Sequence, residues 1–469
     1  MKKITIDPVT RIEGHAKITI DLDDAGNAVD AKIHVTQFRG FEKFCQGRPF
    51  SEMPSLMART CGICPVSHLV SGAKAGDGLL SVKVPKTGAN LRRIMNLAQI
   101  MQSHSLNFFH LSSPDILLGF DADPKERNIF YLMSKEPAIA KMGVGLRAFG
   151  QHIIEILGNK RIHPAWIVPG GVNAPLAPAQ REEILSKIDE KKRDALAAIE
   201  LFKSKLSSFP KEIAAIANFD TLFMSMVGKD GELDHYDGKI KFIDAKGNTV
   251  AENLEPSDYQ SYIGERVEDF SFMKSPYYLP FGPEKGVYRV GPLARLNIAK
   301  RCGTPLADKE LGIFKSYAPT QNASFFYHYA RLIEVLYCIE KIEELLNEPD
   351  ILSDHVRAVA KLNEFEAVGM SEAPRGTLLH HYKTDKNGLI TFANLIIATG
   401  HNNLAMNAGI TQAAKEFVRG EYTHGALNRV EAVIRAFDPC LSCATHAQGK
   451  MGFEVAFRRD GEIVDKKFI

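Results

Sequence analysis

The chain has 469 residues, of which 45% are hydrophobic and 24% charged, and its 58 basic and 56 acidic side chains give a net charge of +2. This balance is typical of a soluble globular protein and gives no reason to expect nucleic acid or an anionic membrane as a partner. No run of about eighteen uncharged apolar residues occurs, and the start MKKITIDPVTRIEGH lacks the apolar segment of a signal peptide, so we expect no membrane span and a cytoplasmic location.

Strand and helix patterns follow one another along the first half of the chain. KITID, HAKITIDL and AVDAKIHV alternate apolar and polar residues around the turn DDAGN, which predicts an antiparallel hairpin or meander. Residues 89–111 carry apolar side chains at a helical period, and we expect that helix to end before Pro114. Residues 177–206 place acids early and bases late, which predicts one long helix with a solvated face.

The second half predicts further helices and two hairpins. DHYDGKIKFIDAKGNTVAEN indicates a small β insertion at about 228–255 with Lys-Gly-Asn-Thr as its turn, and residues 323–350 read as a helix ended by Pro349. GFEVAFRRDGEIVDKK predicts a terminal hairpin with Asp-Gly at the turn. Without an internal repeat or linker, the pattern favours one α+β unit, mainly helical, with small peripheral antiparallel sheets from the N- and C-terminal segments.

Two Cys-x-x-Cys pairs are the main chemical signal. RTCGICPVSH contains Cys61 and Cys64, DPCLSCATH contains Cys440 and Cys443, and a histidine follows each pair. Seven cysteines are too few for a disulfide framework in so long a chain. A zinc ribbon closes its pairs over roughly fifteen to twenty residues, whereas Cys64 and Cys440 are 376 positions apart. The whole fold must therefore form before four thiols can meet.

Residue spacing alone leaves several interpretations of these pairs open. A structural tetrathiolate zinc site is one of them. A thioredoxin-like redox pair is another, although Cys61 and Cys64 do not begin the helix of a recognisable βαβ unit. Buried cysteines without a ligand are a third. Soft thiolates suit nickel, iron or zinc, and the spacing does not choose among these metals.

The residues around the cysteines resemble a known family. RTCGICPVSH and DPCLSCATH resemble the first and last signature motifs of the large, catalytic subunit of nickel-iron hydrogenases, and DPVTRIEGH, FRGFEKF, HLSSPD, EAPRGTL and NLIIATGHNN resemble further blocks in the expected order. FRGFEKFCQGRP, FFYHYARLIEV and DPCLSCATHA look most like the cytoplasmic bidirectional, NAD-reducing branch. The near relative is the non-F420-reducing, heterodisulfide-linked archaeal branch. The resemblance implies the large-subunit fold and reversible heterolytic cleavage of dihydrogen.

The resemblance also implies a metal centre held by all four cysteines. Cys61, Cys64, Cys440 and Cys443 are expected to ligate nickel, and Cys64 and Cys443 would bridge to an iron that carries one carbonyl and two cyanides. Thiolates are strong donors to such a metal pair and leave a position open between the metals for dihydrogen.

Several other side chains are implied to surround this centre. His68 would hydrogen-bond the bridging thiolate of Cys443, and Arg375, beside Pro374, would lie over the open position. Asp115 and Asp438 resemble the carboxylates that hold this arginine, because a buried guanidinium without a partner is costly.

The proton and the cyanide ligands have implied partners too. Glu13, in RIEGH, resembles the carboxylic acid that receives the proton first carried by Cys440. Thr399 resembles the hydroxyl that hydrogen-bonds a cyanide, although Ala398 stands where the family often has proline. For each of these residues taken alone, an ordinary core or surface role would be the commoner one.

A separate magnesium ion is implied near the end of the last motif. Glu42, His446 and the carbonyl of Leu395 resemble its ligands. Oxygen ligands suit this hard cation, whereas a histidine is less typical, so this expectation follows the family and not the general rule.

The resemblance implies partners and processing. In this family an endopeptidase cuts after the histidine of the last motif once nickel chaperones have delivered the metal. We therefore expect residues 1–446 to form one mature domain and residues 447–469 to be a maturation extension that keeps Cys440 and Cys443 accessible during metal insertion.

Electrons must leave through another chain. Cys45, Cys302 and Cys338 are too scattered for an iron-sulfur cluster, and no G-x-G-x-x-G fingerprint occurs, so we expect neither cluster, flavin nor NAD site here. A small subunit with an iron-sulfur cluster and flavin-containing diaphorase subunits are the expected partners.

One alternative belongs to another functional class. Relatives of this fold in respiratory-type complexes, and structural zinc-bound assembly subunits, lose cysteine ligands. All four ligands are present here, which favours catalysis.

Overall fold

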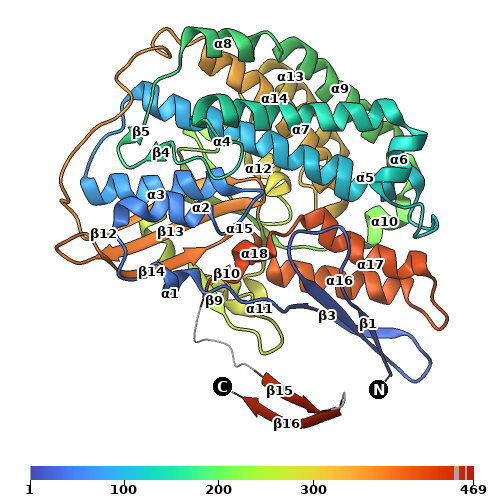
Figure 1. Cartoon of the computed structure of the whole chain (residues 1–469). Helices are drawn as coiled ribbons and strands as arrows, with labels where there is room; N and C mark the ends of the chain where they lie inside the picture. Colours follow the sequence, from blue (N-terminus) through green and yellow to red (C-terminus); the bar gives the residue numbers. More distant parts are fainter. Residues whose placement is uncertain (1, 448–453, 460–461, 469) are drawn as a thin grey trace.

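The computed structural model describes residues 2–447, 454–459 and 462–468. Long helices fill the upper part of the molecule in Figure 1, and most of the strands lie below them. The helix α4 packs against both α7 and α14, and α9 packs against α14. The mainly helical α+β class expected from the sequence is confirmed. The central helices are α4 (Lys86–Leu106), α7 (Pro137–Gly158), α9 (Ile188–Lys205) and α14 (Tyr327–Leu346).

The helices α4 and α14 form the middle of the core. Nearly every side chain of both helices is buried, including polar ones such as Gln99 and Arg331. A helix that is buried all round belongs to the interior of a large domain, where its polar groups need partners. One apolar cluster that includes both helices extends along the chain from Ile4 to Ala444.

The N-terminal meander is present as predicted. Its three strands pair antiparallel in the order β1-β2-β3, and alternate side chains of β2, such as Ile18 and Ile20, are fully buried. The strand β3 packs against α16, which comes from the other end of the chain. These elements are β1 (Lys2–Ile6), β2 (Ala16–Leu22), β3 (Ala28–Val35) and α16 (Asn403–Phe417).

The predicted insertion is a hairpin, but it belongs to a larger sheet. The strands β7 and β8 pair antiparallel, and the Asp244 carboxylate closes their turn by accepting hydrogen bonds from the amides of Lys246 and Asn248 at 2.8 and 2.9 Å. The sheet order is β11-β6-β7-β8, with β11 parallel to β6. Its strands are β6 (Leu222–Val227), β7 (Lys239–Ile243), β8 (Thr249–Leu254) and β11 (Tyr288–Arg289).

A second antiparallel sheet, which the sequence did not predict, lies beside the first cysteine pair. Its order is β12-β13-β14, and α3 packs against β12 and β13. The tight turn between β12 and β13 carries Pro374 and Arg375, and Gly376 has a φ of +133° there, a conformation that favours glycine. The elements are α3 (Pro65–Leu80), β12 (Glu366–Ala373), β13 (Gly376–Thr384) and β14 (Ile390–Ile396).

Two helix predictions were wrong in their boundaries. The helix expected to stop before Pro114 instead continues as a π-helix (Asn107–Ser112) and then as α5 (Ser113–Leu118). Pro114 lies in the first turn of α5, where a helix does not need the missing N–H. Residues 177–206 form two main helices, α8 (Pro178–Leu185) and α9, which are separated by a turn at Ser186 and Lys187. The charge pattern describes their exposed face and does not detect the break.

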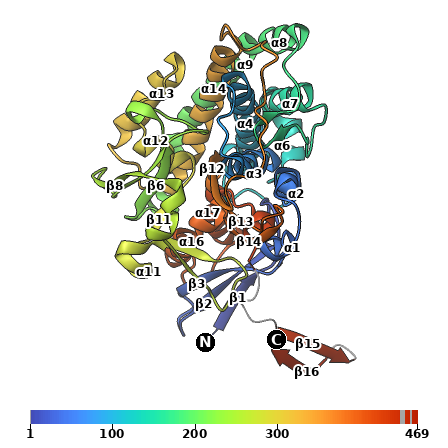
Figure 2. The same ribbon diagram turned by 90° about the vertical axis from the view of Figure 1, so that its left-hand side faces the viewer.

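The end of the helix α14 at Leu346, before Pro349, agrees with the sequence prediction. The predicted terminal hairpin is also present as β15 (Glu454–Arg459) and β16 (Glu462–Phe468), but its expected turn, Asp460 and Gly461, lies outside the described residues. Figures 1 and 2 both show this hairpin below the body of the molecule. None of the described helices has the length and apolar character needed to cross a membrane.

The remaining helices and strands connect these units. They are α1 (Phe41–Phe44), α2 (Met53–Ala58), α6 (Ile129–Lys135), β4 (Ile167–Val168), β5 (Gly171–Val172), α10 (Pro210–Ala215), β9 (Ile263–Arg266), β10 (Ser275–Tyr278), α11 (Gly282–Lys285), α12 (Pro292–Ile298), α13 (Pro305–Tyr317), α15 (Ala398–His401), α17 (His424–Phe437), α18 (Leu441–Ala444), β15 (Glu454–Arg459) and β16 (Glu462–Phe468).

The close approach of α4 and α7 gives a test of the core. A Cβ added at Gly150 would overlap the carbonyl oxygen of Ala98, so Gly150→Ala should lower the free energy of unfolding by about 1–3 kcal/mol. Gly312, exposed in α13, has nothing within 4 Å of an added Cβ, so Gly312→Ala should raise the free energy of unfolding by about 0.5–1 kcal/mol. Thermal unfolding of both variants measures the difference. A Gly150→Ala chain as stable as the unchanged protein would contradict this packing.

Candidate metal centre

The first cysteine pair lies at the N-terminus of α3. Cys64 is the residue before the first helical turn, which Pro65 begins, and the amide of Ile63 donates to Cys61 Sγ at 3.2 Å. A helix N-terminus favours negative charge, so it suits a thiolate. His163 Nε2 lies 2.9 Å from the carbonyl oxygen of Cys61, and this contact fixes the loop from a distant part of the chain.

The second pair follows the end of α17. Asp438 adopts a left-handed conformation with φ 56°, which turns the chain toward Cys440. The backbone of Cys440 forms a parallel bridge with Glu13, and its amide donates to Thr399 Oγ1 at 2.8 Å. Cys443 lies in the short helix α18. The N-terminal segment and α15 therefore hold this pair.

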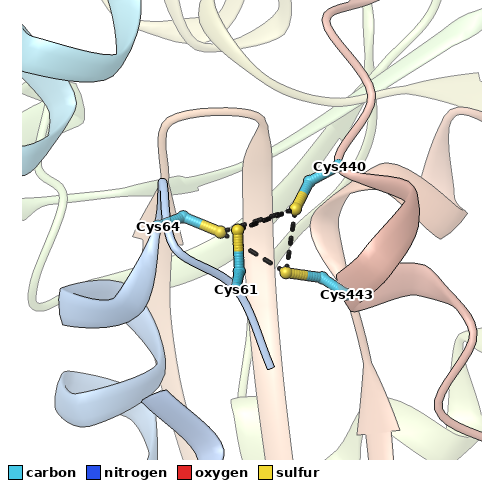
Figure 3. Close-up of side chains that lie close together, drawn as sticks. All are labelled: Cys61, Cys64, Cys440 and Cys443. Atoms are coloured by element: carbon cyan, nitrogen blue, oxygen red, sulfur yellow. Dashed lines mark hydrogen bonds between the residues drawn. The ribbon is translucent and has the colours of Figure 1, made fainter. Parts of the chain in front are cut away.

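The four thiols meet at one point. Figure 3 shows their side chains converging from two separate segments. The Sγ–Sγ distances are 3.2 Å for Cys61–Cys440, 3.4 Å for Cys64–Cys443 and 2.9 Å for Cys440–Cys443. All four atoms lie within 4.8 Å of one another, and each residue is 5% exposed or less. The prediction that the two distant pairs meet is confirmed.

The electrostatics of this cluster call for a cation. Hydrogen bonds from Cys440 and Cys443 hold the pKa of Cys61 well below its usual value, whereas burial raises the pKa values of Cys440 and Cys443 well above theirs. Four buried thiolates would repel one another without positive charge between them. The donor set therefore fits one or two soft metal ions, whose binding would release the thiol protons.

A small cavity of about 10 Å³ lies beside the thiols. Three of the four cysteines line it, together with the sequence-predicted residues His68, Pro374, Arg375 and Thr399. The sequence analysis did not single out the other lining residues, although most of them stand next to residues that it did name. These are Ser67, Ala373, Leu378 and Ile397, and Ala398, which the sequence analysis named beside Thr399, completes the lining.

Arg375 is fixed by the end of α17. Its guanidinium donates to the backbone carbonyl and, at 3.0 Å, to the carboxylate of Asp438, and at 3.3 Å to Ser103 Oγ. Burial alone would lower the pKa of Arg375, but the carboxylate of Asp438 and the thiolate of Cys440 raise it above its usual value. Arg375 thus keeps its positive charge beside the thiols.

The expectation that Asp115 also holds Arg375 is wrong. The Asp115 carboxylate instead accepts hydrogen bonds from Arg11 at 2.6 Å, Arg435 at 2.5 Å and Asn428 at 3.0 Å. Burial would raise the pKa of Asp115, but Arg435 and Arg11 lower it. Asp115 lies in the first turn of α5 and faces α17 and the loop after β1. It ties these elements together.

A fully buried arginine that the sequence analysis missed supports the turn that carries Arg375. Arg295 makes two hydrogen bonds to the Glu334 carboxylate at 2.6 and 2.7 Å and one to Glu372 at 2.8 Å. It also donates to the carbonyl oxygens of Ala373 and Pro374 at 2.9 and 3.2 Å. Paired, bidentate contacts of this kind make a buried arginine a rigid support. No local sequence signal marks it.

The remaining predicted residues near the thiols lie as follows. His68 Nε2 is 3.4 Å from Cys443 Sγ, and burial lowers the pKa of His68 to about 4. Glu13 is partly exposed, and its carboxylate accepts a hydrogen bond from the amide of Ser442 at 3.1 Å. Thr399 and Pro374 line the cavity.

The three predicted magnesium ligands come together at α1. Glu42 Oε1 lies 2.8 Å from His446 Nδ1 and accepts a hydrogen bond from the amide of Leu395 at 2.9 Å. Burial would raise the pKa of Glu42, but His446 lowers it to about 2. The contact from Leu395 is made by its N–H and not by the carbonyl that the sequence analysis named.

Comparison with known proteins assigns the family. Residues 39–131 and 209–446 match the family described as nickel-dependent hydrogenase, and residues 3–38 match one described as HoxL-like. The chain belongs to the nickel-dependent hydrogenase family. The chain is thus a hydrogenase large subunit, and its four-cysteine cluster can bind a nickel-iron site.

Individual relatives of this hydrogenase cover nearly all of it. The chain is 42% identical to the NAD-reducing hydrogenase HoxS subunit beta of Cupriavidus necator over 99% of both proteins. It is 41% identical to one subunit of the F420-non-reducing hydrogenase vhu of Methanocaldococcus jannaschii, over 88% of this chain and 99% of that protein. A crystal structure of an NAD+-reducing nickel-iron hydrogenase in the H2-reduced state matches with a TM-score of 0.93 at 43% identity, covering 95% of this chain and 100% of that one. The expected large-subunit fold is confirmed.

The contacts of Arg375 give a test of the centre. Lysine cannot make the three directed hydrogen bonds of the guanidinium, so in Arg375→Lys we expect hydrogen-dependent dye reduction to fall about 100-fold while nickel content is kept. Arg161 is exposed, so Arg161→Lys, which makes the same substitution at the surface, is the control. Activity of Arg375→Lys close to that of the control would show that the guanidinium has no role at the centre.

Proposed function

We propose that this hydrogenase subunit cleaves dihydrogen reversibly and heterolytically and passes the electrons through a partner subunit to NAD(P). The convergence of four buried thiols beside a cavity that Arg375 lines carries the catalytic part of this proposal. The NAD-linked part is supported by the 42% identity to the HoxS subunit beta.

The four thiols would hold a nickel-iron centre with one carbonyl and two cyanides on iron. Cys61 and Cys440 would be terminal ligands of nickel, and Cys64 and Cys443 would bridge to iron. This division follows the resemblance of the two motifs; both proposed bridging cysteines line the cavity, as does Cys440. When bound, two adjacent metals supply the polarisation that dihydrogen, an uncharged molecule, cannot obtain from side chains.

The side chains around the cavity would bind the diatomic ligands and the substrate. Thr399 Oγ1 accepts a hydrogen bond from the Cys440 amide and keeps its own proton, so it can donate a hydrogen bond to a cyanide. Arg375 offers a fixed positive charge over the open position, and Asp438 keeps it there. Pro374 is an apolar wall of the same cavity and excludes water from it.

The proton would leave through Cys440 and Glu13. The backbone bridge between these residues keeps them adjacent, and the Ser442 amide orients the Glu13 carboxylate. Glu13 is partly exposed, so it can exchange the proton with solvent.

A magnesium ion would bind Glu42, the carbonyl of Leu395 and His446. In an antiparallel strand the N–H and C=O of one residue face the same edge. Since the Leu395 N–H faces Glu42, its carbonyl lies on the same edge of β14.

Electrons would pass to a small subunit with an iron-sulfur cluster and then to flavin-containing diaphorase subunits, in the cytoplasm. Cys45, Cys302 and Cys338 are buried, and none of them joins a metal-binding group among the described residues. A partner must therefore take over the electrons.

Residues 1–446 would form the mature domain, after a maturation endopeptidase removes residues 447–469. The bond to be cut is covered, since Thr445, His446 and Ala447 are 5% exposed or less. The amides of Arg39 and Gly40 bind the Thr445 carbonyl at 3.0 and 3.1 Å. Nickel chaperones and the endopeptidase would therefore act before this segment closes over the centre.

The F420-non-reducing, heterodisulfide-linked branch is the second candidate, because the Methanocaldococcus jannaschii protein is 41% identical. Hydrogen-dependent NAD reduction by the complex purified with its native partners distinguishes the two. Reduction of viologen dyes without reduction of NAD would favour the second branch. A structural, non-catalytic relative in a respiratory-type complex would reduce neither.

Metal content tests the proposed centre. The matured complex should contain nickel in this subunit, and its infrared spectrum should show one carbonyl and two cyanide stretching bands. Cys443→Ser should lose the bands and most of the nickel, because the proposed bridging thiolate, which would hold both metals, is gone. Zinc in place of nickel, without infrared bands, would refute the proposed centre.

The mass of the subunit tests the proposed processing. In active, matured complex the chain should end at His446, so that residues 447–469 are missing from its intact mass. Full-length chain in fully active enzyme would show that the extension is not removed. Inactive apoprotein, which should keep the extension, serves as the control.

A further inference from the structure

A chain of hydrogen bonds runs from the thiols into β13. His68 Nε2 lies 3.4 Å from Cys443 Sγ, and His68 Nδ1 lies 3.1 Å from His380 Nε2. His380 Nδ1 lies 2.8 Å from the hydroxyl of Tyr382. The three side chains are 1% exposed or less, so bulk water does not compete for these contacts.

The donors and acceptors in this series of hydrogen bonds can be arranged in only two directions. A neutral imidazole has one N–H donor and one lone pair, so each link holds one proton. If Tyr382 donates to His380, then His380 donates to His68, and His68 donates to Cys443. If the order is reversed, the lone pair of His68 Nε2 faces Cys443, which would then have to supply a proton.

The state of Cys443 selects between these directions. A metal-bound cysteine is a thiolate and has no proton to give. Only the direction that starts at Tyr382 then makes a hydrogen bond at every link. Burial lowers the pKa of His380 well below its usual range and raises the pKa of Tyr382 well above its own, which keeps the imidazole neutral and the phenol protonated.

We propose that His380 and Tyr382 are positioning residues that fix the tautomer of His68, so that His68 donates a hydrogen bond to the Cys443 thiolate. This bond withdraws electron density from the sulfur, and through it from the attached metal. The inference rests on the proposed role of Cys443 as a bridging ligand.

The neighbouring histidine provides a matched control. Side chains alternate along a strand, so His381 points away from His380 and Tyr382. Its ring contacts the Tyr259 hydroxyl at 2.9 Å and Glu366 at 2.8 Å. His381→Leu therefore changes the same kind of side chain one position away without touching the chain of hydrogen bonds.

The test is the infrared spectrum of the matured complex, with its nickel content measured in parallel. In His380→Leu and Tyr382→Phe the carbonyl band should move to lower wavenumber, because a thiolate without its donor makes the iron more electron-rich. In His380→Gln the amide can still donate to His68, so the carbonyl band should lie closer to its position in the unchanged enzyme. His381→Leu should leave the band in place.

A double variant tests whether the two residues act through one another. Because Tyr382 acts only through His380, adding Tyr382→Phe to His380→Leu should cause no further shift. Unmoved bands in metal-loaded His380→Leu and Tyr382→Phe, or an equal shift in His381→Leu, would overturn the inference. Should His380→Leu fail to assemble, Tyr382→Phe decides alone. Unchanged enzyme without any carbonyl or cyanide band would instead refute the proposed centre, and this inference with it.

Discussion

Sulfur atoms from opposite ends of the polypeptide must reach one point, and the rest of the structure depends on this constraint. Cys64 immediately precedes α3, and Cys440 follows α17, 376 positions later. Neither pair alone supplies a four-thiol site, so metal affinity exists only once the fold has brought α3, the Glu13 segment and α18 together. The hydrogen bonds from Arg39 and Gly40 to Thr445 then close the last segment over the centre.

Buried charges keep the cavity beside the sulfurs in shape. Arg295, which is paired with Glu334 and Glu372, supports the turn between β12 and β13. Asp438 fixes Arg375, which this turn carries. Each of these arginines has a carboxylate partner, which offsets the cost of burying its charge. The hydrogenase thus presents a positive group to the cavity on a rigid support, while Asp115 braces the neighbouring helices.

Local patterns were readable in the sequence, and distant pairings were not. The strands of the N-terminal meander alternate apolar and polar residues, and the hairpin β7–β8 carries turn residues. Both could therefore be predicted. The strand β13 is almost wholly buried and has no alternation, which hid its sheet. The cysteines were recognisable by spacing and by resemblance. By contrast, Arg295 with Glu334 and His68 with His380 are pairs that only the folded chain defines. Asp115 was assigned to Arg375 by resemblance, and its actual partners, Arg11 and Arg435, also become its neighbours only in the folded chain.

Nickel K-edge X-ray absorption of the matured complex tests most directly whether both ends of the chain bind one centre. We predict four sulfur neighbours around nickel, and three after Cys61→Ser as well as after Cys440→Ser. A nickel shell dominated by nitrogen and oxygen would contradict this prediction. A nickel shell with only two sulfur neighbours would also contradict it if the number of sulfurs fell in only one of the two variants.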